Sequence, residues 1–169
     1  MFSFVRPLRA LVKGLQANDS PRQLAFGVAL GMLIGLTPKG NLIAVALITT
    51  LFAIKVNRGS GLASAFVFSW VGVLLDPLSH YIGGLILTTA ALEPTFAWLS
   101  ELPVVPWTSF NNTVVMGSVV LGAFLFYPIY RASKMGFPIL TPIVVAHLSK
   151  YKMYHILTGT DFATRWKLS

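Results

Sequence analysis

The sequence predicts an all-α integral membrane protein, and its composition and the placement of its charges support this. The 169 residues are 55% hydrophobic and only 11% charged, with a mean hydropathy of +0.73, whereas soluble domains carry about 25% charged residues. The apolar residues form long runs, and the lysines and arginines lie between these runs and at both ends, as they do beside membrane segments. We expect about four to six short membrane segments, re-entrant hairpins among them, and an N-terminal amphipathic surface helix.

Several functional classes are disfavoured by composition and spacing. The chain has no cysteine, so it offers neither disulfides nor thiolate metal ligands. The net charge of +8 does not predict a nucleic-acid partner, because the basic residues flank apolar runs instead of forming one patch. The three histidines are scattered, without metal-ligand spacing. We therefore expect no enzyme activity, no metal and no cofactor.

Residues 1–19 are predicted to form an amphipathic cytoplasmic surface helix. Apolar side chains recur there at helical spacing, and Arg9 and Lys13 fall on the opposite side. The apolar positions are Leu8, Leu11, Val12 and Leu15. Such a helix suits an anionic leaflet, and the alternative is an ordinary cytoplasmic helix that packs on the rest of the protein.

Residues 20–92 are predicted to be a membrane core with two broken apolar hairpins. Pro38 and Gly40 break the first apolar stretch, and Pro77, after Asp76, is expected to break the second, residues 61–92, into two segments. The two halves of the first stretch are each about 20 Å long, shorter than the roughly 30 Å of a hydrocarbon core. They are either two short spans or one re-entrant hairpin with a buried tip.

The first helix of this core is expected to begin at Ser20, because Gln23 completes a capping box with it. Within the helix, Gly27, Gly31 and Gly35 recur every four residues and form a stripe of small residues. In lipid such a stripe lets another helix approach closely. We favour packing within the chain over dimerisation, although a homo-oligomer stays open.

The rest of the chain is predicted to contain one uninterrupted membrane span, together with a loop, a proline-broken apolar segment and a tail. Residues 93–112 have three prolines, two tryptophans and no basic residue, which predicts a periplasmic or interfacial loop. Residues 113–169 contain the span at 114–130, an apolar segment broken by Pro138 and Pro142, and a basic cytoplasmic tail.

The positive-inside rule predicts that both termini face the cytoplasm. Twelve of the thirteen basic residues lie in four zones, at 6–22, 55–58, 131–134 and 150–167, and only Lys39 lies elsewhere. Putting 93–112 outside requires an odd number of crossings after Arg58, whereas a break at Pro77 implies an even number. The sequence leaves this conflict open.

Two charges interrupt the apolar stretches, Lys39 and Asp76, and they define a candidate polar site together with Asn41 and His80. A charge at the bilayer centre costs about 2.5–3.5 kcal/mol unless it faces water, protein or an opposite charge. One hypothesis is that Lys39 and Asp76 pair or line one polar cavity. The alternative is that each lies at a turn among the headgroups.

The order of these motifs resembles a bacterial family. Ser20-Pro21-Arg22, the three glycines, Pro38-x-Gly40, Val56-Asn57-Arg58 and Asp76-Pro77 together are similar to the domain-of-unknown-function family numbered twenty sixty-two, over residues 20–87. The resemblance implies a small helical inner-membrane protein without an assigned activity. One branch of similar proteins, in bacteria with outer membranes, is often encoded beside a larger uncharacterised protein, and membership of that branch would imply a protein partner in the envelope.

This chain departs from the family pattern at two positions. The family usually has an apolar or aromatic residue in place of Lys39, and Asn-Pro in place of Asp76-Pro77. The two new charges are of opposite sign, which favours the pairing hypothesis.

These observations predict a non-enzymatic membrane subunit or anchor for a cell-envelope partner protein in a bacterial inner membrane, in contact with membrane lipid. The alternative is a small transporter or channel for an ion, a small solute or a lipid, because broken membrane segments often mark such sites.

Overall fold

The structure is a computed structural model, which describes residues 20–148, with side chains as far as residue 139. This part of the chain is helical and contains no strand. In chain order its helices are α2 (Pro21–Leu36), α3 (Leu42–Ala53), α4 (Arg58–Leu87), η1 (Ala90–Leu92), α5 (Glu93–Glu101), η2 (Val105–Thr108) and α6 (Thr113–Leu148). The predicted N-terminal surface helix and the basic tail lie outside the described residues.

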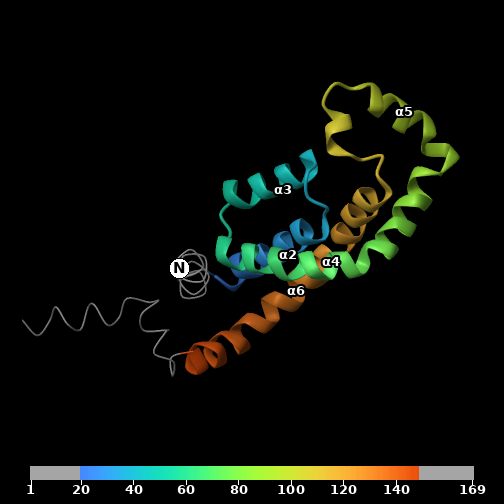
Figure 1. Ribbon diagram of the computed structural model, residues 1–169. Coiled ribbons are helices and arrows are strands. Elements are labelled where there is room, and N and C mark those ends of the chain that lie inside the picture. Colours follow the sequence, from blue (N-terminus) through green and yellow to red (C-terminus); the bar gives the residue numbers. More distant parts are fainter. Residues whose placement is uncertain (1–19, 149–169) are drawn as a thin grey trace, which may run out of the picture.

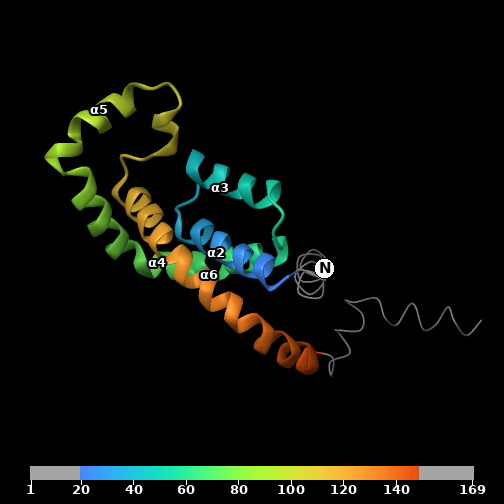
Figure 2. The same ribbon diagram turned by 180° about the vertical axis from the view of Figure 1, so that it is seen from behind.

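Three helices, α2, α4 and α6, pack together as a bundle (Figures 1 and 2). Helices α2 and α4 run parallel, because Gly27 lies against Ser60 near both helix starts and Gly72 lies against Leu36 farther along. Helix α6 runs in the opposite direction, since Gly122 lies against Leu33 whereas the later Phe126 packs on Phe26 near the start of α2. The short α3 follows α2 in the chain and returns it toward the start of α2, where α4 begins (Figure 1).

The predicted start of α2 is confirmed. The Ser20 side chain accepts a hydrogen bond from the Gln23 backbone N–H, and the Ser20 N–H donates to Oε1 of Gln23 at 3.0 Å, which completes the capping box. The helix ends where Thr37 becomes extended. The proline at position 38 disfavours a helical conformation of Thr37, which fixes this end.

The predicted break between α2 and α3 is also confirmed, so these helices form a hairpin with residues 37–41 at its tip. Gly40 has φ of 94°, which L side chains rarely adopt. Asn41 then caps α3, because its Oδ1 accepts from the Ala44 N–H at 2.9 Å. Little of α3 is buried apart from Ala44 and Leu51, so most of this apolar helix has no protein neighbour among the described residues.

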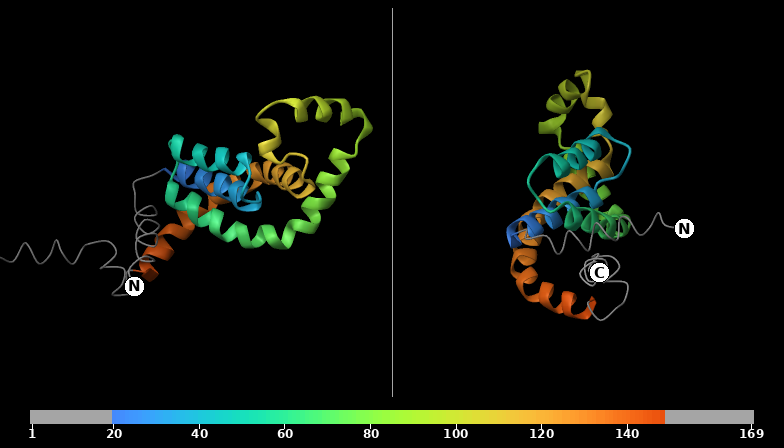
Figure 3. Two further views of the ribbon diagram at one scale, coloured as in Figure 1. Left: turned by 45° about the horizontal axis from the view of Figure 1, so that its top comes forward. Right: turned by 90° about the vertical axis from the view of Figure 1, so that its left-hand side faces the viewer.

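The expected break at Asp76–Pro77 is wrong. Helix α4 continues from Arg58 to Leu87 with Pro77 inside it. Proline removes one backbone hydrogen bond and displaces the preceding turn, and α4 curves along its length (Figure 3). The helix continues because Ser79 and Gly83, just after the proline, pack closely on Gly117 of α6. One continuous helix is compatible with the odd number of crossings that the positive-inside rule predicts.

The expected breaks at Pro138 and Pro142 are wrong as well. Helix α6 runs from Thr113 to Leu148 through both prolines. Asn112 begins it, because its Oδ1 accepts from the N–H groups of Val114 and Val115 at 2.9 and 3.2 Å. Prolines are tolerated within membrane helices, where local adjustments satisfy the freed backbone groups.

The segment 93–112, expected as a loop, is largely helical. It contains α5 and η2, and η1 precedes it directly. Phe96 of α5 packs on Phe110 with ring centroids 6.0 Å apart, which draws the two ends of the segment together. Pro94 and Pro106 occupy first-turn positions of these short helices, where proline is favoured. Two of the three prolines of this segment therefore lie at helix starts, and Pro103 lies in the turn between them.

Two helices are long and apolar enough to cross a membrane. These are α4 over Arg58–Leu87 and α6 over Thr113–Ile139, and only 17% and 22% of their most apolar windows are buried in the protein. Helices α2 and α3 are apolar but shorter. Four to six complete spans are therefore more than the helix lengths alone establish.

Candidate functional site

Helices α2 and α4 meet along the predicted glycine stripe. A side chain at Gly31 would collide with the carbonyl of Gly61, and one at Gly35 would lie 2.6 Å from Cβ of Phe68. The close approach lets Ser60 Oγ donate to the Leu24 carbonyl at 3.0 Å and Ser64 Oγ donate to the Val28 carbonyl at 2.7 Å. The stripe is thus an intramolecular packing surface, as we favoured.

Lys39 lies at the tip of the α2–α3 hairpin and closes the end of α2. Its Nζ donates to three backbone carbonyl oxygens, at 2.7 Å to Ile34, 3.0 Å to Gly35 and 2.8 Å to Thr37. The last carbonyls of a helix have no partner within the helix and carry partial negative charge. The ammonium group neutralises that charge and uses all three of its N–H donors.

Asp76 does not pair with Lys39. It is partly buried on α4, and no hydrogen bond or ion pair joins it to any residue of the described chain. The structure therefore does not form the ion pair that the complementary charges predicted.

The other two candidate residues have hydrogen-bond partners outside the candidate site. Asn41 caps α3 and donates from Nδ2 to the Pro38 carbonyl at 2.8 Å. His80 is exposed, and its Nδ1 lies 2.6 Å from Oγ1 of Thr113 at the start of α6. Within residues 20–139, no hydrogen bond or ion pair joins any two of the four predicted site residues. Lys39, Asn41 and His80 hold helix ends in place, Asp76 does not, and the four residues do not form one polar centre.

Apart from Lys39, the described basic residues gather at one end of the bundle. The Asn57 N–H donates to the Gln23 carbonyl at 3.3 Å, so the starts of α2 and α4 lie side by side. Tyr130 of α6 packs on Phe26 in the same region, with ring centroids 6.1 Å apart. This arrangement brings together Arg22, Lys55, Arg58, Arg131 and Lys134.

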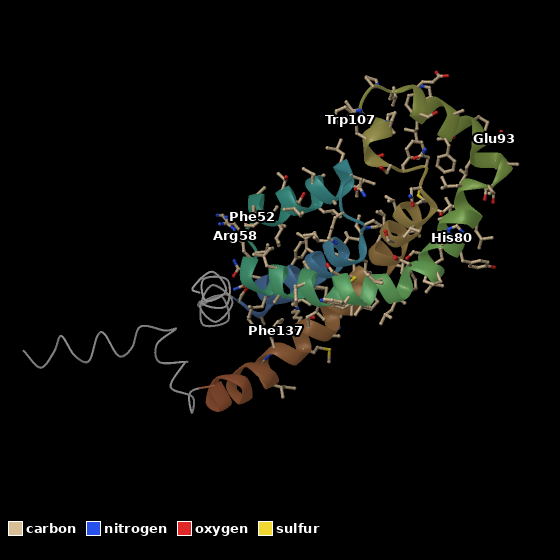
Figure 4. All side chains as sticks on the ribbon, viewed as in Figure 1. Phe52, Arg58, His80, Glu93, Trp107 and Phe137 are labelled. Carbon is tan, nitrogen blue, oxygen red and sulfur yellow. The ribbon has the colours of Figure 1, made fainter. Side chains whose placement is uncertain are left out.

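The candidate polar residues lie toward the opposite end of the bundle. Figure 4 shows Arg58 far from His80, Glu93 and Trp107. The hairpin tip lies on this far side too, because Gly72, one turn before Asp76, packs on Leu36 at the end of α2. Lys39, Asp76 and His80 therefore form a second polar level, well separated from the basic one.

The distance between these two levels matches a bilayer core, a relation that we did not use when predicting the site. Arg58 and Asp76 are eighteen residues apart on one helix, or about 27 Å at 1.5 Å per residue, close to the roughly 30 Å of hydrocarbon. If Arg58 lies at one boundary of the hydrocarbon core, this helical rise places Asp76 near the other boundary. This geometry favours the alternative in which both charges lie near headgroups.

Large apolar side chains cover the outside of the bundle between these levels. Trp70 and Phe66 of α4 are each 69% exposed, and Phe124 of α6 is 76% exposed. Further exposed apolar residues on α3, α4 and α6 are Val45, Ile48, Phe52, Leu62, Val67, Val73, Leu74, Val120 and Tyr127. An apolar surface this extended is typical of a membrane or protein interaction site.

Comparisons with known proteins identify a relative without an assigned role. No family model matches the chain, and no solved structure matches it. The resemblance to the family numbered twenty sixty-two therefore stays a prediction. A protein of Treponema pallidum (strain Nichols) described as uncharacterized is 33% identical over 130 residues, which cover 77% of this chain and 80% of that protein. The chain belongs to the same family as this Treponema pallidum protein.

Proposed function

We propose that the protein is a non-enzymatic subunit or anchor in a bacterial inner membrane that works with a cell-envelope partner protein. The observation that carries this proposal is the exposed apolar surface of α4 and α6, which lies between two polar levels about one hydrocarbon thickness apart. Lipid suits this surface, since each large apolar side chain transferred from water contributes about 1.5–3 kcal/mol.

The helix directions support one topology. If the basic end is cytoplasmic, α2 runs outward, α3 returns, α4 crosses outward and α6 crosses back. This order places 55–58 and 131–134 inside and 93–112 outside, in agreement with the positive-inside rule. It is the same whether the α2–α3 hairpin crosses as two short spans or re-enters from the cytoplasmic side.

The transporter alternative loses its main support. The transporter hypothesis relied on a polar site at the broken segments. However, all three N–H groups of Lys39 Nζ donate to backbone carbonyls at the end of α2, and α4 is unbroken. A transporter needs polar groups that are free to bind a substrate near the membrane midplane. An anchor needs only a stable membrane bundle and a surface for its partner. The resemblance would add a partner protein if the chain belongs to the branch that is often encoded beside a larger protein.

Affinity purification from native membranes tests the anchor proposal. The tagged protein, extracted in mild detergent, should recover one envelope protein in constant stoichiometry. A variant with Gly117→Ala, whose bundle is expected to be destabilised, should recover less of it, and Gly84→Ala, at a site without close neighbours, should recover the normal amount. A lone oligomer that a small solute stabilises would contradict the proposal and support a transporter.

The proposed orientation predicts the labelling of single cysteines, which are simple to introduce because the chain has none. Lys55 and Asn111 are both exposed and lie in different connections. In intact spheroplasts, an impermeant thiol reagent should label Asn111→Cys at once and Lys55→Cys only after the membrane is opened. Labelling of position 55 alone would show that the orientation is reversed.

A further inference from the structure

We propose that residues 77–112 form a cap that lies on the outer leaflet, with Trp98, Val104 and Trp107 inserted at the boundary between headgroups and acyl chains. This inference rests on the proposed membrane placement. It adds a lipid-binding surface to the two membrane-crossing helices.

The length of α4 places this segment beyond the hydrocarbon core. The helix has 30 residues, or about 45 Å, which is some 15 Å more than the core it would cross. With Arg58 at the inner boundary, the outer boundary falls near Asp76. The turns after Pro77 then lie at the outer interface, where they still pack on α6 through Ser79 and Gly83 before the curved helix leads on to α5 (Figure 3).

Contacts within the fold keep the cap beside the membrane. After α5 the chain folds back, and η2 contacts α3 of the hairpin. Phe96 and Phe110 close the segment upon itself, and His80 is bonded to Thr113 where the segment rejoins the bundle. The cap thus lies alongside the end of the hairpin and does not extend into the periplasm.

The chemistry of the exposed side chains matches a leaflet surface. Trp98 is 60% exposed, Val104 59% and Trp107 75%, and tryptophan prefers the interface, where its ring is apolar and its N–H finds an acceptor. Leu78, Tyr81 and Leu85 of α4 continue the exposed apolar surface toward the membrane helices. Continuity with the lipid-facing surface favours a leaflet over a protein partner.

Fluorescence quenching by brominated lipids tests this placement. The chain has four tryptophans, and variants that keep only Trp107 or only Trp70, with phenylalanine at the other three positions, are reconstituted in phosphatidylcholine vesicles. Bromines near the headgroup should quench Trp107 more than bromines near the chain ends do. Trp70, 9 Å or so before the outer boundary by helical rise, should be quenched more by the deeper bromines than Trp107 is.

The two probes separate the possible failures. If Trp70 is quenched and Trp107 is not, the cap is free for a protein partner and the leaflet proposal is overturned, while the membrane placement stands. If neither is quenched, both proposals fail. Should the single-tryptophan variants not fold, a nitroxide on Val104→Cys should collide more with oxygen than with a water-soluble nickel complex, and the reverse preference would overturn the leaflet proposal.

Discussion

Alanine at Gly83 or Gly117 is expected to destabilise the protein strongly, by at least about 1–3 kcal/mol, the usual effect of overpacking. A Cβ at Gly83 would collide with the carbonyl of Thr113, and a Cβ at Gly117 with the carbonyl of Ser79. These obstacles are backbone atoms, which cannot rotate away as a side chain could. Helices α4 and α6 would have to separate, with loss of van der Waals contacts along the whole interface.

Gly84 provides the matched control, because it is the next residue on the same helix and, beyond its own turn of helix, no described atom lies within 4 Å of its added Cβ. Alanine there should leave the stability unchanged or raise it by up to about 0.5–1 kcal/mol through better helix propensity. Unfolding of the three variants in nanodiscs, followed by circular dichroism, measures the difference. Equal stabilities for Gly83→Ala and Gly84→Ala would contradict the close α4–α6 packing.

The features that the sequence predicted correctly depend on short-range chemistry. The capping box of Ser20 and Gln23 involves residues three apart, and Pro38 and Gly40 set a turn by their own backbone preferences. The glycine stripe was predicted because small residues at helical spacing allow another helix to approach closely. Its partner surface on α4 required the structure, since Ser60 and Ser64 are separated from it by the whole of α3.

The prolines show where such local rules fail. Pro77, Pro138 and Pro142 were all expected to break apolar stretches into separate segments, yet each lies inside a continuous helix. The decisive contacts for Pro77 are long-range, because the turn that follows it is held by Gly117 of α6. A rule that considers only neighbouring residues cannot weigh this packing against one lost hydrogen bond.

For the candidate site, the sequence picked out individual residues and not their arrangement. The sequence identified the unusual residues, because Lys39 and Asp76 are charged positions in apolar surroundings, but it could not tell whether they meet. The three carbonyls that accept hydrogen bonds from Lys39 belong to residues 34, 35 and 37. The residue types at these positions do not indicate that their carbonyls lack a partner. A helix end always leaves such carbonyls, so a nearby lysine is a sufficient explanation without Asp76.

Replacing Lys39 with methionine should destabilise the hairpin by about 1.5–3 kcal/mol, the range for hydrogen bonds of charged groups. Methionine keeps much of the apolar length but leaves the carbonyls of Ile34, Gly35 and Thr37 without the ammonium donor. Lys55→Met is the matched control, because Lys55 is an exposed lysine in the next connection. That change should stay within about 0.5 kcal/mol, as surface substitutions usually do.

A double-mutant cycle with Asp76→Asn separates helix capping from ion pairing. Because Lys39 bonds only to backbone carbonyls, its loss and the loss of the Asp76 charge should be additive, with a coupling energy below about 0.5 kcal/mol in nanodisc unfolding. A buried ion pair would behave differently, since each single change would then cost about 3–5 kcal/mol and the double variant would regain much of it. Such recovery would show that the two charges meet in the membrane, and it would restore the polar site on which a transporter depends. Additivity together with a destabilised Lys39→Met variant would instead show that the lysine serves to close α2 at the hairpin tip.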